Sequence, residues 1–147
     1  MVIMFEINLN KSYGENFQET QNNLKKIEGI EKFYQLQKEI YHTDFLDWGD
    51  DQIDELHLHP NHTTLTVRIC SSRRNIFYNE KKIKRIFWMI DFYDIELHYF
   101  DIAPEHWIDD IIIQQNVDGK YSISFGNGEL DFRYSSAKVN RCWIEYF

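Results

Sequence analysis

The sequence is poor in cysteine, proline and glycine, and it has no long hydrophobic run. Its 147 residues include two cysteines, two prolines and six glycines. Two thiols do not make the disulfide framework of a small secreted module, so we expect a reduced, cytoplasmic setting. No apolar run approaches the ~20 residues that a membrane-spanning helix needs. The first ten residues also lack the basic start and apolar stretch of a signal peptide. We therefore expect neither secretion nor a membrane partner.

Core-forming side chains, in contrast, are abundant. Hydrophobic residues make up 43% of the chain and aromatic residues 16%, far more than a disordered chain contains. A chain of this length can bury one core without metals or disulfides. Because no repeat, low-complexity tract or proline- and glycine-rich linker divides it, we expect a single domain over residues 1–147.

Basic residues are missing from two long stretches, and both stretches are acidic. No Lys or Arg lies between Glu39 and Arg68, or between Arg85 and Lys120. The segment from Arg68 to Arg85 is basic instead, although the net charge of the whole chain is -8. Acidic surfaces repel phosphate backbones and attract basic partners. The charge pattern therefore disfavours nucleic acid as the main ligand and favours a basic protein.

Helical periodicity is confined to the first third of the chain. Apolar residues recur at helical intervals over residues 16–41, within a segment rich in Gln, Glu, Lys and Asn. Gly29 interrupts the pattern and the apolar arc rotates across it, so one kinked helix and two short helices both fit. Before this segment, Val2 to Leu9 alternates loosely between apolar and polar residues, which predicts a first strand.

From about residue 52 onward, nearly every segment alternates in the manner of a β-strand. Residues 56–69 predict a hairpin that turns at residues 60–62, and the Asn-Gly pair at residues 127–128 predicts another. Further strands are expected at 86–92, 95–99, 107–113 and 142–146, with a break near Asp94. Short connections favour antiparallel pairing. The expected fold class is α+β, with an N-terminal helical segment packed on a mostly antiparallel β-sheet or partly closed β-sandwich.

Residues that could perform catalysis lack the motifs that would activate them. Ser71 and Ser72 lack the glycine elbow of a serine nucleophile, and Cys70 alternates with core-type residues, which favours a structural role. The glycine turn at residues 126–128 lacks the Lys-Ser/Thr pair and the following helix of a phosphate-binding loop. We therefore expect no enzymatic activity and no cofactor.

Histidines leave a metal-dependent hydrolase open as an alternative. His57, His59 and His62 are close in sequence, and two ligands on one strand face could point at one metal ion. His98 and His106 could supply a proton carrier. No fourth ligand has useful spacing, although Asp54 or Glu55 could be drawn in. An ordinary solvated strand face is therefore favoured and no metal site is predicted.

The basic segment leaves an RNA-associated binding module open as a second alternative. Arg73 to Arg85 could contact phosphates while Phe77 and Tyr78 stack on bases. A solvated segment that neutralises its acidic neighbours is favoured over this interpretation.

Each acidic stretch contains a tryptophan that is bracketed by carboxylates, Trp48 in one and Trp107 in the other. Protein interfaces commonly combine such aromatic anchors with a charged rim. We therefore predict a protein-binding face. Its candidate residues are Asp47, Trp48, Asp50, Asp51, Asp54, Glu55, Glu105, Trp107, Asp109 and Asp110.

Three segments in the second half of the chain carry a family resemblance. They are FYDIEL at residues 92–97, WIDDIII at 107–113 and DGKYSISFGNGELDF at 118–132. From about Asp51 to its C-terminus, the chain resembles bacterial immunity proteins of polymorphic toxin systems, of the Imm50 type. It departs from them at residues 49–52, where Gly-Asp-Asp-Gln replaces an expected histidine–aspartate pair, and the N-terminal helical region has no counterpart.

The resemblance implies a cytoplasmic antidote that binds a cognate toxin and blocks its active site or the approach of its substrate. Such families have no catalytic residues. The acidic balance fits a basic, nuclease-type toxin, because a carboxylate-rich inhibitor can occupy the surface that grips nucleic acid. The sequence does not fix the oligomeric state.

Overall fold

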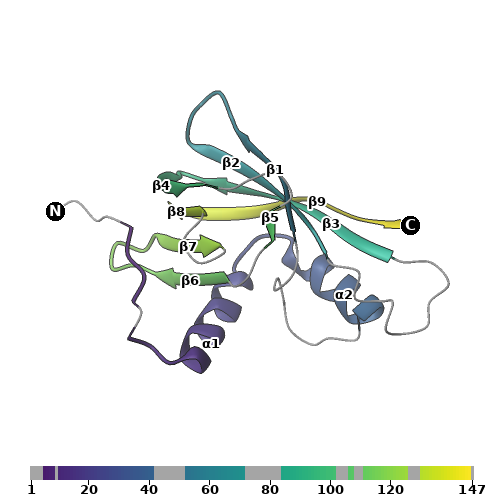
Figure 1. The fold of residues 1–147 in the computed structure, drawn as a ribbon, viewed down its shortest axis with the longest axis horizontal. Helices are drawn as coiled ribbons and strands as arrows, with labels where there is room; N and C mark the ends of the chain where they lie inside the picture. Colours follow the sequence, from purple (N-terminus) through teal and green to yellow (C-terminus); the bar gives the residue numbers. More distant parts are fainter. Residues whose placement is uncertain are drawn as a thin grey trace.

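The chain forms an α+β fold with two helices followed by antiparallel sheets, as predicted (Figure 1). The structure, a computed structural model, describes residues 5–8, 10–41, 52–71, 84–101, 106–107, 111–125 and 130–146. The helices are α1 (Tyr13–Leu24) and α2 (Ile30–Tyr41). The strands are β1 (Gln52–Leu58), β2 (Thr64–Cys70), β3 (Lys84–Tyr93), β4 (Glu96–Phe100), β5 (His106–Trp107), β6 (Ile111–Gln115), β7 (Tyr121–Phe125), β8 (Leu130–Tyr134) and β9 (Ser136–Tyr146). No helix within these residues is long and apolar enough to cross a membrane.

The helical segment is two helices rather than one kinked helix. Ser12 begins α1 by accepting a hydrogen bond from the backbone N–H of Glu15 at 3.2 Å, which satisfies one of the free donors of the first turn. Between the helices, Gly29 has a φ of 81°, a left-handed conformation that a residue with a side chain rarely adopts. This glycine lets the chain change direction before α2.

The strands form two antiparallel sheets, which we name sheet A and sheet B. Sheet A has the strand order β5-β1-β2-β3-β9, and sheet B has the order β4-β8-β7-β6. The predicted hairpin of β1 and β2 is confirmed, and Asn61 stabilises its turn by accepting hydrogen bonds from the backbone N–H groups of Thr63 and Thr64. The pairing of β7 with β8 is also confirmed, although its Asn-Gly turn lies outside the described residues.

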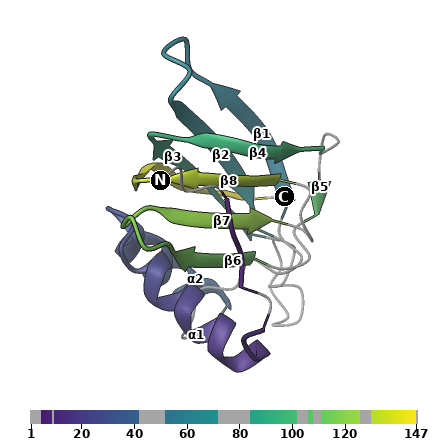
Figure 2. The same cartoon turned by 90° about the vertical axis from the view of Figure 1, so that its left-hand side faces the viewer.

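One long antiparallel ribbon belongs to both sheets. It consists of β3 and β4 on one side and β9 and β8 on the other, with a corner at Asp94 and Ser135. Asp94 has a φ of 53°, and Ser135 donates to its carboxylate at 2.6 Å. The strands of sheet B therefore run across those of sheet A, as Figure 2 shows. The break predicted near Asp94 is this corner.

The core lies between the inner face of sheet A, sheet B and α2. Phe33 of α2 stacks on Trp88 of β3 with ring centroids 3.9 Å apart, and both side chains are fully buried. Phe92 contacts Phe132 of sheet B edge-on at 5.1 Å. Aromatic pairs in these geometries add to the stability that burial of apolar area already provides.

Buried polar residues of α1 cover the outer edge of β6. The Asn23 side chain donates to the backbone carbonyl of Ile113 at 2.8 Å, and the Thr20 hydroxyl accepts from the N–H of the same residue at 3.1 Å. An uncovered strand edge offers free hydrogen-bonding groups to other chains. These two side chains therefore close one edge of sheet B.

The predicted first strand at Val2 to Leu9 is wrong for the part that is described. Residues 5–8 form no strand. The backbone N–H of Asn8 donates to the side chain of Gln114 at 2.7 Å, and that of Glu6 donates to Ser122 Oγ at 3.5 Å. The segment thus lies on sheet B through side-chain hydrogen bonds. Alternation alone does not separate this arrangement from a paired strand.

Candidate protein-binding face

Two of the ten predicted interface residues, Asp54 and Glu55, have described side chains, and both lie on β1. Trp107 lies on β5, of which the backbone alone is described. The remaining predicted residues lie outside the described part of the chain. They are Asp47, Trp48, Asp50, Asp51, Glu105, Asp109 and Asp110.

The pairing of β1 with β5 brings the two predicted acidic segments to one edge of sheet A. Gln52 lies opposite Trp107, and Ile53 lies opposite His106. One acidic segment runs through β1 and the other runs through β5, although more than 50 residues separate them in sequence. Because the strands are adjacent, the backbones of the two acidic segments run side by side at these residue pairs. Asp54 and Glu55 follow directly on β1 and are the described carboxylates beside this edge.

A bulge on β1 places two of these carboxylates opposite one arginine. The register shifts between Ile53 and Glu55, so that Asp54 and Glu55 both reach Arg68 on β2. Arg68 forms an ion pair with each carboxylate. Its Nη2 lies 2.7 Å from Asp54 Oδ2, and its Nη1 lies 3.4 Å from Glu55 Oε2. All three side chains are partly exposed, so each ion pair contributes no more than about 1 kcal/mol. A partner's cation can compete for these carboxylates.

An aromatic and cationic stack lies on the outer face of sheet A, away from the core. Trp143 of β9 stacks on Phe87 of β3 with ring centroids 5.5 Å apart, and the guanidinium carbon of Arg141 lies 4.5 Å from the Trp143 ring centroid. Trp and Arg are the residues most often found at binding hot spots. The sequence reasoning missed this stack. The alternation of residues along β9 could have predicted it. Cys142 and Ile144 pack on the core, so Trp143 between them faces outward.

A chain of hydrogen bonds also crosses this outer face. The Thr66 hydroxyl donates its single hydrogen to Asp91 Oδ1 at 2.5 Å. His59 Nε2 lies 2.7 Å from the Thr66 oxygen and must therefore be the donor in that bond. In a hydrolase triad the hydroxyl donates to the histidine instead. The donors and acceptors of this chain are instead arranged to hold neighbouring strands together. Asn140 of β9 extends the chain by donating to Asp91 Oδ2 at 2.9 Å.

Among the described side chains, the histidines proposed for a metal-dependent hydrolase do not assemble into a metal-binding cluster, and the side chain of His106 lies outside the described part. Within the described ranges, no group of three or more His, Cys, Asp or Glu residues is arranged to hold a metal ion. His57 and His59 have ring centroids 4.9 Å apart, whereas the His98 ring stacks on Phe5 at 4.8 Å. His62 occupies the tip of the β1–β2 hairpin with a φ of 62°.

The two cysteines are not joined by a disulfide bond. Cys70 is buried and lies close to the backbone carbonyl of Ser71, at 3.5 Å. Burial raises the pKa of Cys142 to about 11, even though nearby Lys32 acts in the opposite direction. A thiol with a raised pKa is a poor nucleophile near neutral pH, because the thiolate is the reactive form.

The basic segment proposed for RNA binding lies largely outside the described residues. Arg85, at its end, is described, and its side chain donates to the carbonyl of Ser71 at 3.0 Å and to Gln52 Oε1 at 3.4 Å. Arg85 therefore holds the ends of β1 and β2 together. The RNA-associated module stays a prediction.

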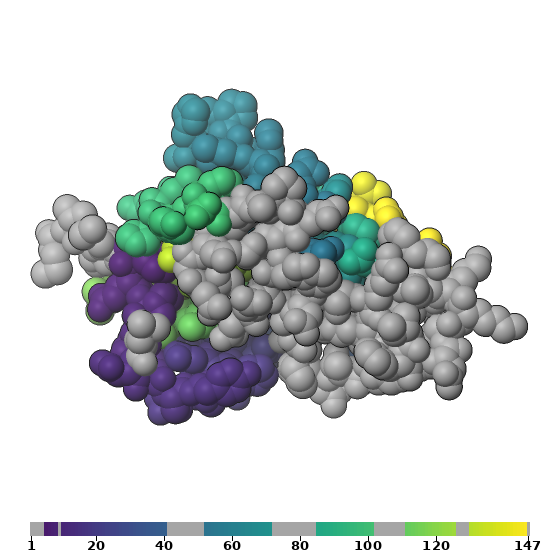
Figure 3. Space-filling model, viewed as in Figure 1, coloured from purple at the N-terminus to yellow at the C-terminus, as the bar shows by residue number. Residues whose placement is uncertain are grey.

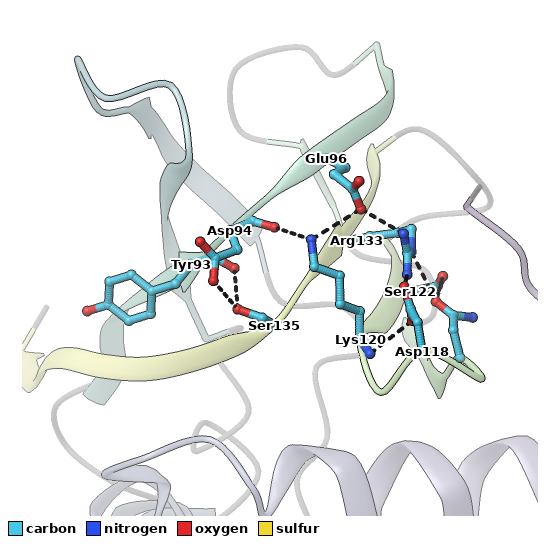
Figure 4. A network of polar contacts seen from close by, with 9 residues as sticks. Tyr93, Asp94, Glu96, Asp118, Lys120, Ser122, Arg133 and Ser135 are labelled. Carbon is cyan, nitrogen blue, oxygen red and sulfur yellow. Dashed lines mark hydrogen bonds and ion pairs between the residues drawn. The ribbon is translucent and has the colours of Figure 1, made fainter. Parts of the chain in front are cut away.

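A second charged cluster lies on sheet B and is centred on Arg133, whose side chain is 3% exposed (Figure 4). Arg133 binds Glu96 of β4 at 2.7 Å and also forms an ion pair with Asp118 in the β6–β7 turn. Its Nε donates to Asn116 at 3.3 Å, and Lys120 binds Glu96 at 3.3 Å. The hydrogen bond from Arg133 is the main cause that lowers the pKa of Asp118. This cluster ties β4 to the β6–β7 turn.

Comparison with protein-family models, with curated proteins and with solved structures finds no match for this chain. Function is therefore inferred from the chain's own residues and their geometry.

Proposed function

We propose that this chain is a non-catalytic protein-binding module, and that it acts as a bacterial immunity protein which neutralises a cognate toxin by direct binding. The observation that carries the proposal is the pairing of β1 with β5, which joins the two acidic segments at one edge of sheet A. Asp54 and Glu55 stand beside this edge as exposed or partly exposed carboxylates. A basic, nuclease-type toxin has the complementary charge.

The outer face of sheet A supplies the second requirement of a tight interface. Charge complementarity mainly sets the encounter rate and selectivity, whereas a few desolvated anchors provide most of the affinity. Trp143 and Arg141 form a preformed stack on the same sheet as the acidic edge. A side chain that is already held in place loses less conformational entropy on binding. The acidic edge would thus steer the partner, and the stack would anchor it.

The association rate of the complex tests the role of the acidic edge. The binding partner used is the product of the reading frame that neighbours the gene for this chain. We expect the double variant Asp54→Asn with Glu55→Gln to bind this product about three to ten times more slowly at low salt. The difference should shrink as salt screens the charges. Stopped-flow mixing at several salt concentrations measures both effects.

A matched control has the same change in net charge at a distant site. Glu31→Gln with Glu39→Gln removes two exposed carboxylates from α2, and its association rate should stay within about twofold of the wild type. An equal slowing by both double variants would show a general charge effect and contradict a steering role of β1. Failure of the co-expressed product to form a complex, or to be neutralised, would overturn the immunity function.

A further inference from the structure

In the described part of the chain, β4 has an open edge, as does β1 beyond Ile53, where its pairing with β5 ends. The outer edge of β6 is covered by α1, as described above, and β9 is partly covered by the loop before α2. In that loop, Glu28 N–H donates to the carbonyl of Ala137 and the Glu28 carbonyl accepts from the N–H of Val139. On β4, pairing with β8 uses one edge. In the part of the chain that the structure describes, no hydrogen bond reaches the other edge.

The side chains of β4 are also unusually apolar for a free edge. Every residue of the strand is exposed, and Leu97, Tyr99 and Phe100 expose 48%, 50% and 56% of their surface. Figure 3 shows this green segment at the surface, below the β1–β2 hairpin. Proteins protect an open edge with charged residues such as lysine, with proline or with a β-bulge. β4 contains no lysine or proline, and its one irregularity is the register shift between Leu97 and Tyr99 in its pairing with β8. An exposed apolar edge of this kind is a template for one more strand.

We infer that β4 is a docking site for an extended segment of a basic partner protein, which adds a strand to the edge of sheet B. The inference rests on the proposed function, because it describes how the same partner is held. Backbone groups of the added strand would pair with the free groups of β4, while its apolar side chains cover Leu97, Tyr99 and Phe100.

Charge argues for a basic partner strand rather than a second copy of this chain. Two exposed carboxylates, Glu96 and Asp101, lie at the two ends of β4. Glu96 remains 53% exposed although it also forms ion pairs with Arg133 and Lys120. In an antiparallel pair of two β4 strands, Glu96 of one copy would lie near Asp101 of the other, and like charges across a strand pair are destabilising. Two chains with a net charge of -8 would also repel one another. A partner strand with Lys or Arg at its ends would avoid both kinds of electrostatic repulsion.

The test uses two short peptides and needs no cognate partner. The probes are a blocked peptide of sequence Lys-Thr-Val-Thr-Val-Thr-Lys and the same peptide with Glu at both ends. We expect the lysine peptide to shift the amide NMR signals of Glu96 to Phe100 and to bind about ten times more tightly than the glutamate peptide. Tyr99→Lys should weaken binding of the lysine peptide about tenfold, because it places a cation and an unfavourable side chain at the edge.

Tyr146→Lys is the matched control, because Tyr146 is a similarly exposed aromatic residue on a strand of sheet A. Its affinity for the lysine peptide should equal that of the wild type. Amide shifts away from β4, equal binding of the two peptides, or unchanged binding by Tyr99→Lys would each overturn the inference. Failure of the proposed function appears in a different experiment, as loss of the complex with the neighbouring gene product.

Discussion

Replacing Arg133 by methionine is expected to destabilise the fold by about 3 kcal/mol, because it removes the ion pairs of a buried cation with Asp118 and Glu96 and leaves Glu96 with Lys120 alone. The Arg133 side chain is 3% exposed, whereas Glu96 is 53% exposed and Asp118 is 28% exposed. Water can therefore solvate the carboxylates once the arginine is gone, which places the loss at the lower end of the range for broken buried ion pairs. Denaturant unfolding at pH 7 measures the effect.

The same variant should also be less sensitive to acid. Arg133 holds the pKa of Asp118 below its ordinary value in the folded state. A lowered pKa contributes stability that is present above the unfolded-state pKa and is lost as the pH falls through the folded-state pKa. The free energy of unfolding of the wild type should therefore fall as the pH drops below about 4. The difference in this free energy between the wild type and Arg133→Met should narrow over the same pH range.

Arg141→Met is the control for this substitution, because Arg141 is exposed and lies over the ring of Trp143. Its removal should cost about 1 kcal/mol or less. Equal losses for the two variants at pH 7, or a gap that stays constant in acid, would contradict the structural role assigned to Arg133.

Truncating Trp88 to alanine is expected to cost about 3–5 kcal/mol, because a large buried ring leaves a cavity that its neighbours cannot fill completely. Trp88 has no exposed surface, and it stacks on Phe33 at the junction of sheet A with α2. A loss of this size is a large part of the total stability of an ordinary domain. Thermal and denaturant unfolding measure it.

Trp143 offers a matched control on the neighbouring strand. Phe87 lies opposite Trp143 and Trp88 lies opposite Cys142, so the two tryptophans occupy adjacent positions of one strand pair but point to opposite faces. Trp143→Ala should cost about 1 kcal/mol of stability and should weaken partner binding by about 2 kcal/mol or more. A stability loss equal to that of Trp88→Ala would place Trp143 in the core and remove it from the proposed interface.

Local signals in the sequence predicted much of the fold. The β1–β2 hairpin, the corner at Asp94 and the interruption at Gly29 each depend on residues within a few positions of one another. Alternation of apolar residues fixed which face of β3 is buried, since Trp88 and Phe92 share one parity. Such features follow from local backbone preference and from the side-chain period of a strand.

Long-range features were not available from these patterns. No local signal places β5 beside β1, because β2, β3 and β4 intervene in sequence. Polar residues at buried positions of α1, such as Thr20 and Asn23, bind the edge of β6 rather than water. The alternating residues 5–8 lie on sheet B without joining it as a strand. Each case depends on which surfaces meet after folding.

In the candidate site, too, some features follow from local sequence and others from long-range strand pairing. The acidic character of the segment around Asp54 and Glu55 is visible in the sequence, but its partial neutralisation by Arg68 depends on the bulge in β1. The stack of Trp143 on Phe87 depends on the register of β3 with β9. The class of partner is a prediction from composition, whereas the pairing of strands determines which side chains lie close together.

Amide hydrogen exchange of this chain, alone and in complex with the co-expressed neighbouring gene product, tests the central claim most directly. The account predicts that binding slows exchange in β1 and β5, which form the acidic edge, and around Trp143 on β9. Protection confined to α1 and β6, on a different part of the fold, would contradict a binding face built on sheet A.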